Sequence, residues 1–263
     1  EAPSQHDFDH VYTHQLYAGF GHKQFGELTY GNMVTITDEV KQTDLANTYS
    51  LSDGLLDGSA RRVTQYVYNG NYGDNKVKFG AYYGGSSKRS MKNLDLTNKR
   101  KNAWGTGLIF NHAIYSIQNV TVAAGFTREI SENANNTSYY RNAYGLGLAY
   151  NFVHTTYGLD LERQVTKNQG DKRTKNEVRA VVRQGLNEDW NVYAMYAYKT
   201  DKQFGDTDRT RQFMVGTEYY VYNQGSLKVK PFLEWQATRT KYENSTVDRS
   251  RDFKTVIGLR AYW

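Results

Sequence analysis

The sequence predicts an all-β fold, a transmembrane antiparallel β-barrel, on the strength of three observations. Apolar and polar residues alternate with a period of two along most of the 263 residues. The links between the alternating segments are short and long in turn, as in outer-membrane barrels. No run approaches the roughly 18 consecutive apolar residues that a membrane helix needs. The 23 Tyr, 11 Phe and 4 Trp argue against disorder, although the mean hydropathy is −0.77.

The carboxy-terminal segment shows the alternation most clearly. In 253–263, Phe253, Ile257 and Leu259 share one parity, whereas Lys254 and Arg260 share the other. Successive side chains of a strand point to opposite faces. The segment is therefore expected to be a strand with one apolar and one polar face.

The same pattern predicts thirteen strands along the chain. They are expected near 8–20, 25–33, 61–69, 75–86, 102–111, 118–129, 141–152, 155–165, 176–186, 189–199, 210–222, 227–238 and 253–263. Short links are expected at 21–24, 69–74, 112–117, 153–154, 187–188 and 223–226, and long polar loops at 34–60, 87–101, 130–140, 166–175, 200–209 and 240–252.

A secreted β-sandwich is the competing fold, because its strands also alternate. Its second apolar layer would be a dry core. Here the face opposite the apolar one carries Gly, Lys, Arg, Glu and Gln in strand after strand, which suits a water-filled lumen. Closure of a barrel also satisfies the backbone groups that lipid leaves without partners. The pattern therefore favours the barrel.

The predicted strand count is odd, whereas single-chain bacterial barrels have an even number. The first long loop follows the second strand, so the first strand would run from the outside to the periplasm. We therefore expect an odd number of strands to precede Glu1, and the absence of an initiator Met or signal region there indicates a processed chain or a fragment.

Two stretches and the last residue resemble the Gram-negative general porins, a family of trimeric, sixteen-stranded barrels. Residues 15–32, QLYAGFGHKQFGELTYGN, resemble the paired fourth and fifth strands of that family, and most closely those of the major outer-membrane porins of the Haemophilus and Pasteurella group. Residues 61–69 resemble the strand after the constriction loop. Trp263 resembles the terminal aromatic residue that the outer-membrane assembly machinery recognises. Sixteen strands less the thirteen predicted leaves three, so the resemblance implies that the chain lacks the first three strands.

The resemblance implies a general diffusion porin of the bacterial outer membrane that passes ions and small hydrophilic solutes. It implies one β-barrel domain over 1–263, in which segment 34–60 folds into the lumen as a constriction loop. The acids of this loop would face a basic cluster on the wall, where Arg61 and Arg62 match the family, whereas Asn32 stands where the family commonly has Arg and the loop motif Pro-Glu-Phe-Gly-Gly is missing. The loop acids are Asp38, Glu39, Asp44, Asp53 and Asp57.

Parity gives a second, independent set of lumen charges. Lys or Arg at the bilayer midplane costs about 2–4 kcal/mol, so charged residues of the polar face are expected to point inward. The bases are Lys76, Lys78, Arg179, Arg183, Lys228, Lys230, Lys254 and Arg260, and the acids are Glu27, Asp160, Glu162, Glu218 and Glu234. This excess of bases, with a net charge of +6, predicts a weak anion preference or low selectivity.

Two other barrel functions remain open at this point. A channel specific for oligosaccharides or organic anions would need an aromatic row in the lumen, and the inward aromatic residues are scattered. A non-conducting surface barrel or adhesin would need a plugged lumen, whereas the many inward Gly residues predict open space. The inward aromatic residues are Tyr82, Tyr220, Phe232 and Tyr262.

The histidines do not indicate an enzyme or a metal site. His6, His10 and His14 are four apart, which on a strand separates neighbours by some 13 Å, too far for one metal ion. We expect no cofactor and no nucleic-acid partner. The expected partners are outer-membrane lipid, two further copies of the chain and the assembly machinery. Phosphates of lipopolysaccharide are an alternative to plain loop charge as the reason for the bases at 88–92 and 99–101.

Overall fold

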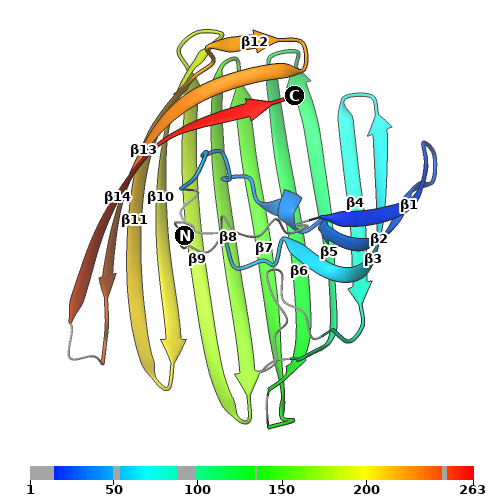
Figure 1. Ribbon diagram of the computed structural model, residues 1–263, viewed down its shortest axis with the longest axis vertical. Coiled ribbons are helices and arrows are strands. Elements are labelled where there is room, and N and C mark those ends of the chain that lie inside the picture. Colours follow the sequence, from blue (N-terminus) through cyan, green and yellow to red (C-terminus); the bar gives the residue numbers. More distant parts are fainter. Residues whose placement is uncertain (1–14, 50–53, 88–98, 134, 245–247) are drawn as a thin grey trace, which may run out of the picture.

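The chain forms one strongly curved antiparallel sheet of 14 strands, seen in a computed structural model that describes residues 15–49, 54–87, 99–133, 135–244 and 248–263 (Figure 1). The strands are β1 Leu16–His22, β2 Gly26–Val34, β3 Ser59–Tyr72, β4 Asn75–Gly84, β5 Lys99–Tyr115, β6 Gln118–Glu132, β7 Ser138–Phe152, β8 Thr155–Asn168, β9 Asp171–Gly185, β10 Trp190–Gln203, β11 Asp206–Tyr219, β12 Tyr222–Gln224, β13 Leu227–Lys241 and β14 Arg249–Tyr262. One 3₁₀ helix, η1, spans Asp38–Val40. Within the described residues no helix is long and apolar enough to cross a membrane.

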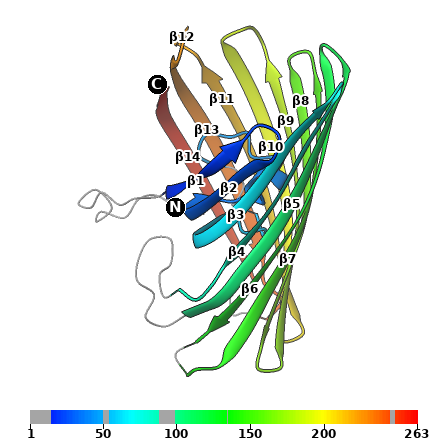
Figure 2. The ribbon, with the colours of Figure 1, turned by 90° about the vertical axis from the view of Figure 1, so that its right-hand side faces the viewer.

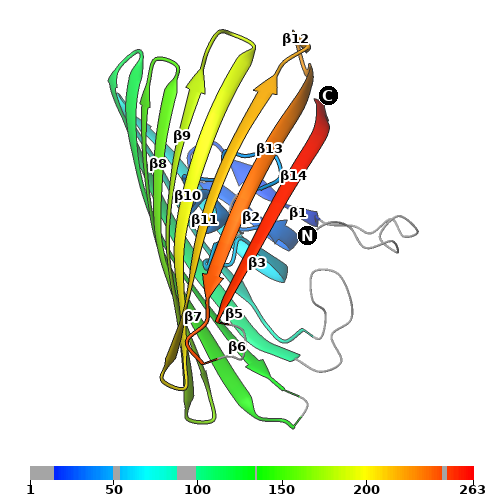
Figure 3. The same ribbon diagram turned by 90° about the vertical axis from the view of Figure 1, so that its left-hand side faces the viewer.

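Strands that follow one another in the chain lie side by side in the sheet, with one local exception. The short β12 pairs only with β13, while β13 also pairs with β11 and with β14. In the described part of the chain β1 and β14 do not pair with each other, so the sheet is an open trough (Figures 2 and 3). Side chains on the concave side of the sheet are called inward below, and those on the convex side outward.

The two faces of the sheet differ as the alternation predicts. On β5 to β7 the inward Ala103, Ala123 and Ala143 are buried, whereas the outward Leu108 and Leu146 are exposed. A convex face of exposed apolar side chains is unfavourable in water and suits contact with lipid. The strand prediction based on parity is therefore confirmed.

Aromatic rings mark both edges of the outward apolar face. Near the loop ends of the strands, Phe126 contacts Trp104 and Tyr144, with ring centroids 4.9 and 5.0 Å away. Near the short turns, Tyr150 stacks on Tyr157 at 6.3 Å. Aromatic girdles at both interfaces are typical of transmembrane barrels.

Most strands are longer than predicted, and two expected long loops prove to be tight hairpins. β8 and β9 are joined by Gln169 and Gly170, with φ of 50° and 94°, and β10 and β11 by Phe204 and Gly205, with φ of 52° and 99°. Positive φ at both central residues is the type I′ geometry. The long loops predicted at 166–175 and 200–209 were wrong because polar residues beyond the apolar band still pair in the ladder.

Three smaller boundary predictions also differ from the structure. β5 continues to Tyr115, so His112 lies in a strand and not in a turn, and its Nδ1 is 2.9 Å from Asn75 Oδ1. The loop predicted at 130–140 shrinks to 133–137. β1 covers only the end of the strand predicted at 8–20, and residues 1–14, with His6, His10 and His14, lie outside the described residues.

One connection crosses the concave face instead of staying at the rim. Residues 35–49 and 54–58, here called the strap, lie on this face between β2, which ends at Val34, and β3, which begins at Ser59 (Figure 1). Two apolar clusters fill the space between strap and wall. One contains Val40, Leu56, Ala123 and Ala143. In the other, Leu45, Ala46 and Tyr49 pack on Val181, Tyr193, Met195, Ala197 and Met214.

Candidate functional site

The strap lies directly on glycines of the wall. A Cβ added at Gly147 would be 2.0 Å from the carbonyl oxygen of Val40, and one at Gly158 would be 2.5 Å from that of Gln42. Glycine has no Cβ and so allows another backbone to approach this closely. At these positions the expectation that inward Gly leaves open space was wrong, because the strap occupies the space.

Two carboxylates of β8 hold the strap on one side. Asp160 accepts hydrogen bonds from the backbone N–H of Gln42 at 2.8 Å and of Thr43 at 3.1 Å, and from the Thr43 hydroxyl at 2.5 Å. Glu162 accepts from the N–H of Leu56 at 2.9 Å and from that of Leu55. Both carboxylates are buried. Hydrogen bonds to an ionised acceptor are the stronger kind, so these contacts fix the strap firmly.

A third wall carboxylate, Glu234 of β13, holds the far part of the strap. It accepts hydrogen bonds from three successive backbone N–H groups, those of Asn47 at 2.6 Å, Thr48 at 3.0 Å and Tyr49 at 2.8 Å. The hydroxyl of Tyr193 donates to it at 2.7 Å. Successive N–H groups that converge on one anion form a nest. The strap thus presents a backbone anion site that the wall carboxylate fills.

A cation of the wall pairs with the two buried carboxylates of β8. Arg179 is 1% exposed and reaches Asp160 at 3.2 Å, Glu162 at 2.8 Å and Glu177 at 3.3 Å. Buried carboxylates without cationic partners would be costly. Arg179 therefore supports the anchors of the strap and does not face pore water.

A similar arrangement lies under the far part of the strap. Glu218 accepts from the Asn47 side-chain amide at 2.8 Å and from Lys230 at 2.6 Å, and it is also paired with Arg183. Arg260 of β14 donates to the backbone carbonyl of Asn47. Asn47 is thereby held by both backbone groups and by its side chain.

The predicted loop acids have three different environments. Glu39 pairs with Lys78 at 2.5 Å, so this predicted acid and this predicted base lie together. Both carboxylate oxygens of Asp57 accept from Arg141 at 3.1 Å. Asp38 pairs with Lys41 inside the strap at 3.0 Å. Asp44 is exposed, and Asp53 lies outside the described residues.

The remaining predicted bases lie mostly in water. Lys76, Lys228, Lys254 and Arg260 are exposed on inward positions of β4, β13 and β14. Lys254 is 3.4 Å from Asp252. Trp263, which follows the end of β14, is 92% exposed.

A β-bulge explains the unusual backbone conformation at Arg62, one of the two arginines that match the family motif. The pairing of β2 and β3 shifts register between Gly31 and Met33, and Arg62 has a φ of 53°. The side chain of Asn32, which stands where the family commonly has Arg, accepts a hydrogen bond from the Arg62 N–H at 3.1 Å. Arg62 is exposed, while Arg61 is half-buried. Asn32 therefore stabilises the bulge.

Sequence reasoning missed several residues that shape this site. Arg141 and Glu129 stand at the ends of the predicted strands 141–152 and 118–129 and were not among the predicted site residues, yet Arg141 lies between Asp57 and Glu129, 3.7 Å from the latter. Nothing in the sequence marks Asn47, because it is a polar residue in a polar loop. Ile36 and Val40 could have been found, since apolar residues in a polar loop indicate packing against another surface. The inward glycines of the wall supply that surface.

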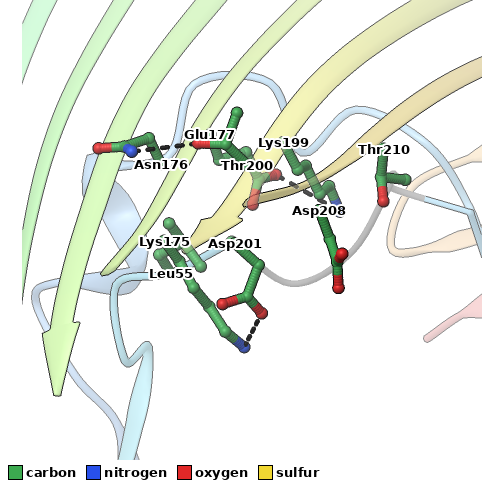
Figure 4. A pocket seen from close by; sticks show the side chains of 10 residues that line it. Leu55, Lys175, Asn176, Glu177, Lys199, Thr200, Asp201, Asp208 and Thr210 are labelled. Carbon is green, nitrogen blue, oxygen red and sulfur yellow. Dashed lines mark hydrogen bonds and ion pairs between the residues drawn. The ribbon is translucent and has the colours of Figure 1, made fainter. Parts of the chain in front are cut away.

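A cavity of about 290 Å³ lies between the returning part of the strap and β9 to β11 (Figure 4). Gly54 and Leu55 line it from the strap, and Lys175, Asp201 and Asp208 are among the residues that line it from the wall. Lys175 is 3.8 Å from Asp201. The lining mixes both signs of charge, so the cavity is part of the polar surface of the trough.

The inward aromatic residues do not form a row. Tyr82 and Phe232 are buried. Tyr220 and Tyr262 flank the ammonium of Lys230, with ring centroids 5.4 and 5.7 Å away. This arrangement offers no aromatic track for a sugar.

An apolar outward face bounded by aromatic rings, with a strap packed inside the curved sheet, defines the class of outer-membrane β-barrel channels. The family model described as Gram-negative porin matches residues 3–229. The chain belongs to this family. The resemblance drawn from residues 15–32 and 61–69 is thus confirmed.

Individual relatives agree with this assignment. The chain is 26% identical over 262 residues to a "Major outer membrane protein" of Pasteurella multocida, covering 96% of this chain and 68% of the relative. Its fold is similar to the trimer form of in-vitro folded OmpT of Vibrio cholerae, with a TM-score of 0.62, 15% identity and coverage of 91% and 77%. It is also similar to an anion-selective porin from Comamonas acidovorans, with a TM-score of 0.66, 15% identity and coverage of 91% and 75%. The chain is a general diffusion porin of the bacterial outer membrane.

Proposed function

We propose that the strap is the constriction of this porin and that the pore has a weak preference for anions. The observation that supports the anion preference is the burial of the acidic side chains of the wall. Asp160, Glu162, Glu218 and Glu234 are each at most 6% exposed and are bonded to the strap or to wall cations. Asp160, Glu162 and Glu218 are paired with wall cations, and Glu234 is enclosed by N–H and O–H donors, so these acids act weakly on ions in the pore.

The inward cations are more accessible than these acids. Lys76, Lys228, Lys254 and Arg260 are exposed, and the Arg183 side chain is 29% exposed. Of the five predicted wall acids, only Glu27 is exposed. A positive potential in a narrow aqueous passage raises the local concentration of anions. The exposed loop acids Glu39 and Asp44 oppose it, which keeps the preference weak.

Planar-bilayer recording under a salt gradient tests the proposal. The protein is isolated from the outer membrane in detergent and recorded with KCl at two concentrations. We expect stepwise conductance and a reversal potential of the sign that anion passage gives. Replacement of Lys76 and Lys254 by Gln should move that potential towards cations, whereas Lys23→Gln, in a short turn, should not. A cation-selective wild type would contradict the charge argument.

We also propose that the porin functions as a homotrimer and that Trp263 is read by the assembly machinery. The trimer proposal is supported by the similar fold of OmpT, which is described in a trimer form. Passage of solutes by diffusion needs no catalytic group, so we propose no enzymatic activity. Native mass spectrometry in detergent should give the mass of three chains, and a monomer mass alone would contradict the trimer.

A further inference from the structure

Three charged residues that line the cavity between the strap and β9 to β11 lie in one row across the wall. They are Lys175 on β9, Asp201 on β10 and Asp208 on β11, here called the charge row (Figure 4). The register pairs Asp201 with Lys175 on one side and with Asp208 on the other. Side chains of such partners are direct neighbours, with Cβ atoms about 4.5–5.5 Å apart. The row therefore presents one base and two acids side by side to the cavity.

The middle member of the charge row already has a cation. Arg173 of β9 donates to both carboxylate oxygens of Asp201, with 2.8 Å between Nε and one of them. Bidentate pairs of this kind are among the strong charge-assisted hydrogen bonds. Two other lining residues, Glu177 and Lys199, are 3.7 Å apart. Neither pair adds net charge to the cavity.

Asp208, at one end of the charge row, has no such cation. In the part of the chain that the structure describes, its carboxylate is not paired with any lysine or arginine, and it accepts the backbone N–H of Glu243 at 3.3 Å. Asp208 is half-buried and lies directly opposite Asp201. Like charges opposite each other destabilise a sheet. A cationic group of a ligand would relieve this repulsion.

Lys175, at the other end of the charge row, is only loosely paired. Its Nζ is 3.8 Å from Asp201, whereas charge-assisted N–H···O bonds measure about 2.7–2.9 Å. The Lys175 side chain is 35% exposed. Because Arg173 occupies both oxygens of Asp201, Lys175 can turn to an anionic group in the cavity. The row thus offers opposite charges at its two ends.

These two ends favour a ligand that carries both charges. A plain anion would meet the two acids of the row, and a plain cation would meet Lys175. A metal ion needs several ligands, and among the described residues no group of three or more His, Asp or Glu side chains could hold one. The chemistry that fits is an ammonium group at Asp208 and a carboxylate at Lys175.

The spacing of the charge row sets the distance between those two groups. Neighbouring strands are about 4.8 Å apart, so Lys175 and Asp208 are separated by about 10 Å across the wall. An extended peptide spans about 3.5 Å per residue, so the ends of a dipeptide are about 7 Å apart and the two side chains cover the rest. The cavity of about 290 Å³ is near the lower size limit of small-molecule sites. Leu55 adds an apolar surface from the strap.

We propose that the charge row binds zwitterionic solutes of about the size of a dipeptide. The ammonium group lies between Asp208 and Asp201, the carboxylate accepts hydrogen bonds from Lys175, and an apolar side chain contacts Leu55. The row is near the β8–β9 and β10–β11 hairpins, at the end of the sheet that carries the longer connections. This end is the outside in barrels of this class. The porin therefore holds such solutes at a saturable site on their way in, besides passing them by diffusion.

Isothermal titration calorimetry of the purified porin in nonionic detergent tests the proposal. The probe is glycyl-leucine, which carries both charges. N-acetylglycyl-leucine lacks the ammonium group and glycyl-leucinamide lacks the carboxylate, so each blocked form loses one of the two contacts. We expect glycyl-leucine to bind at least about tenfold more tightly than either blocked form, because each contact is a charge-assisted hydrogen bond. High salt should weaken its binding.

Two variants assign the two contacts to residues. Asp208→Asn should bind glycyl-leucine at least about tenfold more weakly and should no longer prefer it to the acetylated form. Lys175→Gln should show a similar loss but should no longer prefer it to the amide. Asp252→Asn, the same change at an exposed inward position of β14 outside the cavity, should bind within about twofold of the wild type. A purely structural effect of either variant would weaken all three probes alike.

Four results would overturn the proposal. They are no measurable heat from glycyl-leucine, equal affinity of the wild type for the three probes, glycyl-leucinamide binding as tightly as glycyl-leucine, and unchanged affinity of Asp208→Asn. The third result would assign the charge row to plain cations. Calorimetry measures binding without any current, so each of these outcomes is independent of the constriction and the ion preference proposed above.

Discussion

The backbone N–H of Asn47 in the strap donates a hydrogen bond to the carboxylate of Glu234 on β13, with 2.6 Å between nitrogen and oxygen and 187 positions between the residues. Glu234 is fully buried. The strap therefore does not hang into the trough as a loose loop. Carboxylates of the wall, Asp160 and Glu162 on β8 and Glu234 on β13, hold it at two separate places.

Glu234→Gln should loosen the far part of the strap. A Gln side chain offers one acceptor oxygen where the carboxylate offers two, so at least one backbone N–H among Asn47, Thr48 and Tyr49 loses its partner. An unmade buried hydrogen bond costs about 1–3 kcal/mol. We expect lower stability towards guanidinium in detergent and noisier open-channel current. Glu27→Gln makes the same chemical change at an exposed wall position and should leave both unchanged.

Gly147→Ala should displace the strap from the wall. The added Cβ would be 2.0 Å from the carbonyl oxygen of Val40, so backbone must move. Such overpacking costs about 1–3 kcal/mol, and movement of the strap into the trough should lower the single-channel conductance. Gly85→Ala is the control, because a Cβ there meets nothing within 4 Å. Equal conductance and stability of both variants would mean that the strap does not rest on Gly147.

Asp57 and Arg141 should shift ion selectivity in opposite directions. The two side chains pair at 3.1 Å, and Glu129 is 3.7 Å from Arg141. Asp57→Asn leaves the cation and should favour anions, whereas Arg141→Gln leaves two acids and should favour cations. One charge near the ion path changes a permeability ratio by about two- to fivefold. Reversal potentials of the two variants that shift in the same direction would contradict this assignment.

Parity predicted the faces of the sheet well, because one side of each strand meets lipid and the other does not. The inward placement of Asp160, Glu162, Glu218 and Glu234 followed from it directly. The ends of the strands were harder to predict than their faces, as the β8–β9 hairpin shows. Residues beyond the membrane, such as Lys167 and Lys172, pair in the ladder without any need to be apolar, so alternation fades before the strand ends.

The role of the inward acids was beyond the reach of the sequence pattern. Their partners are backbone N–H groups of the strap, which every residue type except proline carries, so no residue type marks them. The prediction instead set loop acids against wall bases, and the structure places Arg179 and Lys230 with wall acids. Sequence separation of more than 100 positions, as between Gln42 and Asp160, also hides such pairs from local reasoning.

The most direct test of the strap as the constriction uses a single cysteine at Asp44. The chain has no Cys, so Asp44→Cys introduces the only thiol at an exposed position of the strap. A bulky cationic thiol reagent is added during bilayer recording. If the strap lines the narrowest part of the pore, each open channel should lose conductance in a discrete step and regain it on reduction. A channel that is fully labelled, as judged by mass, and still conducts as before would show that ions pass elsewhere.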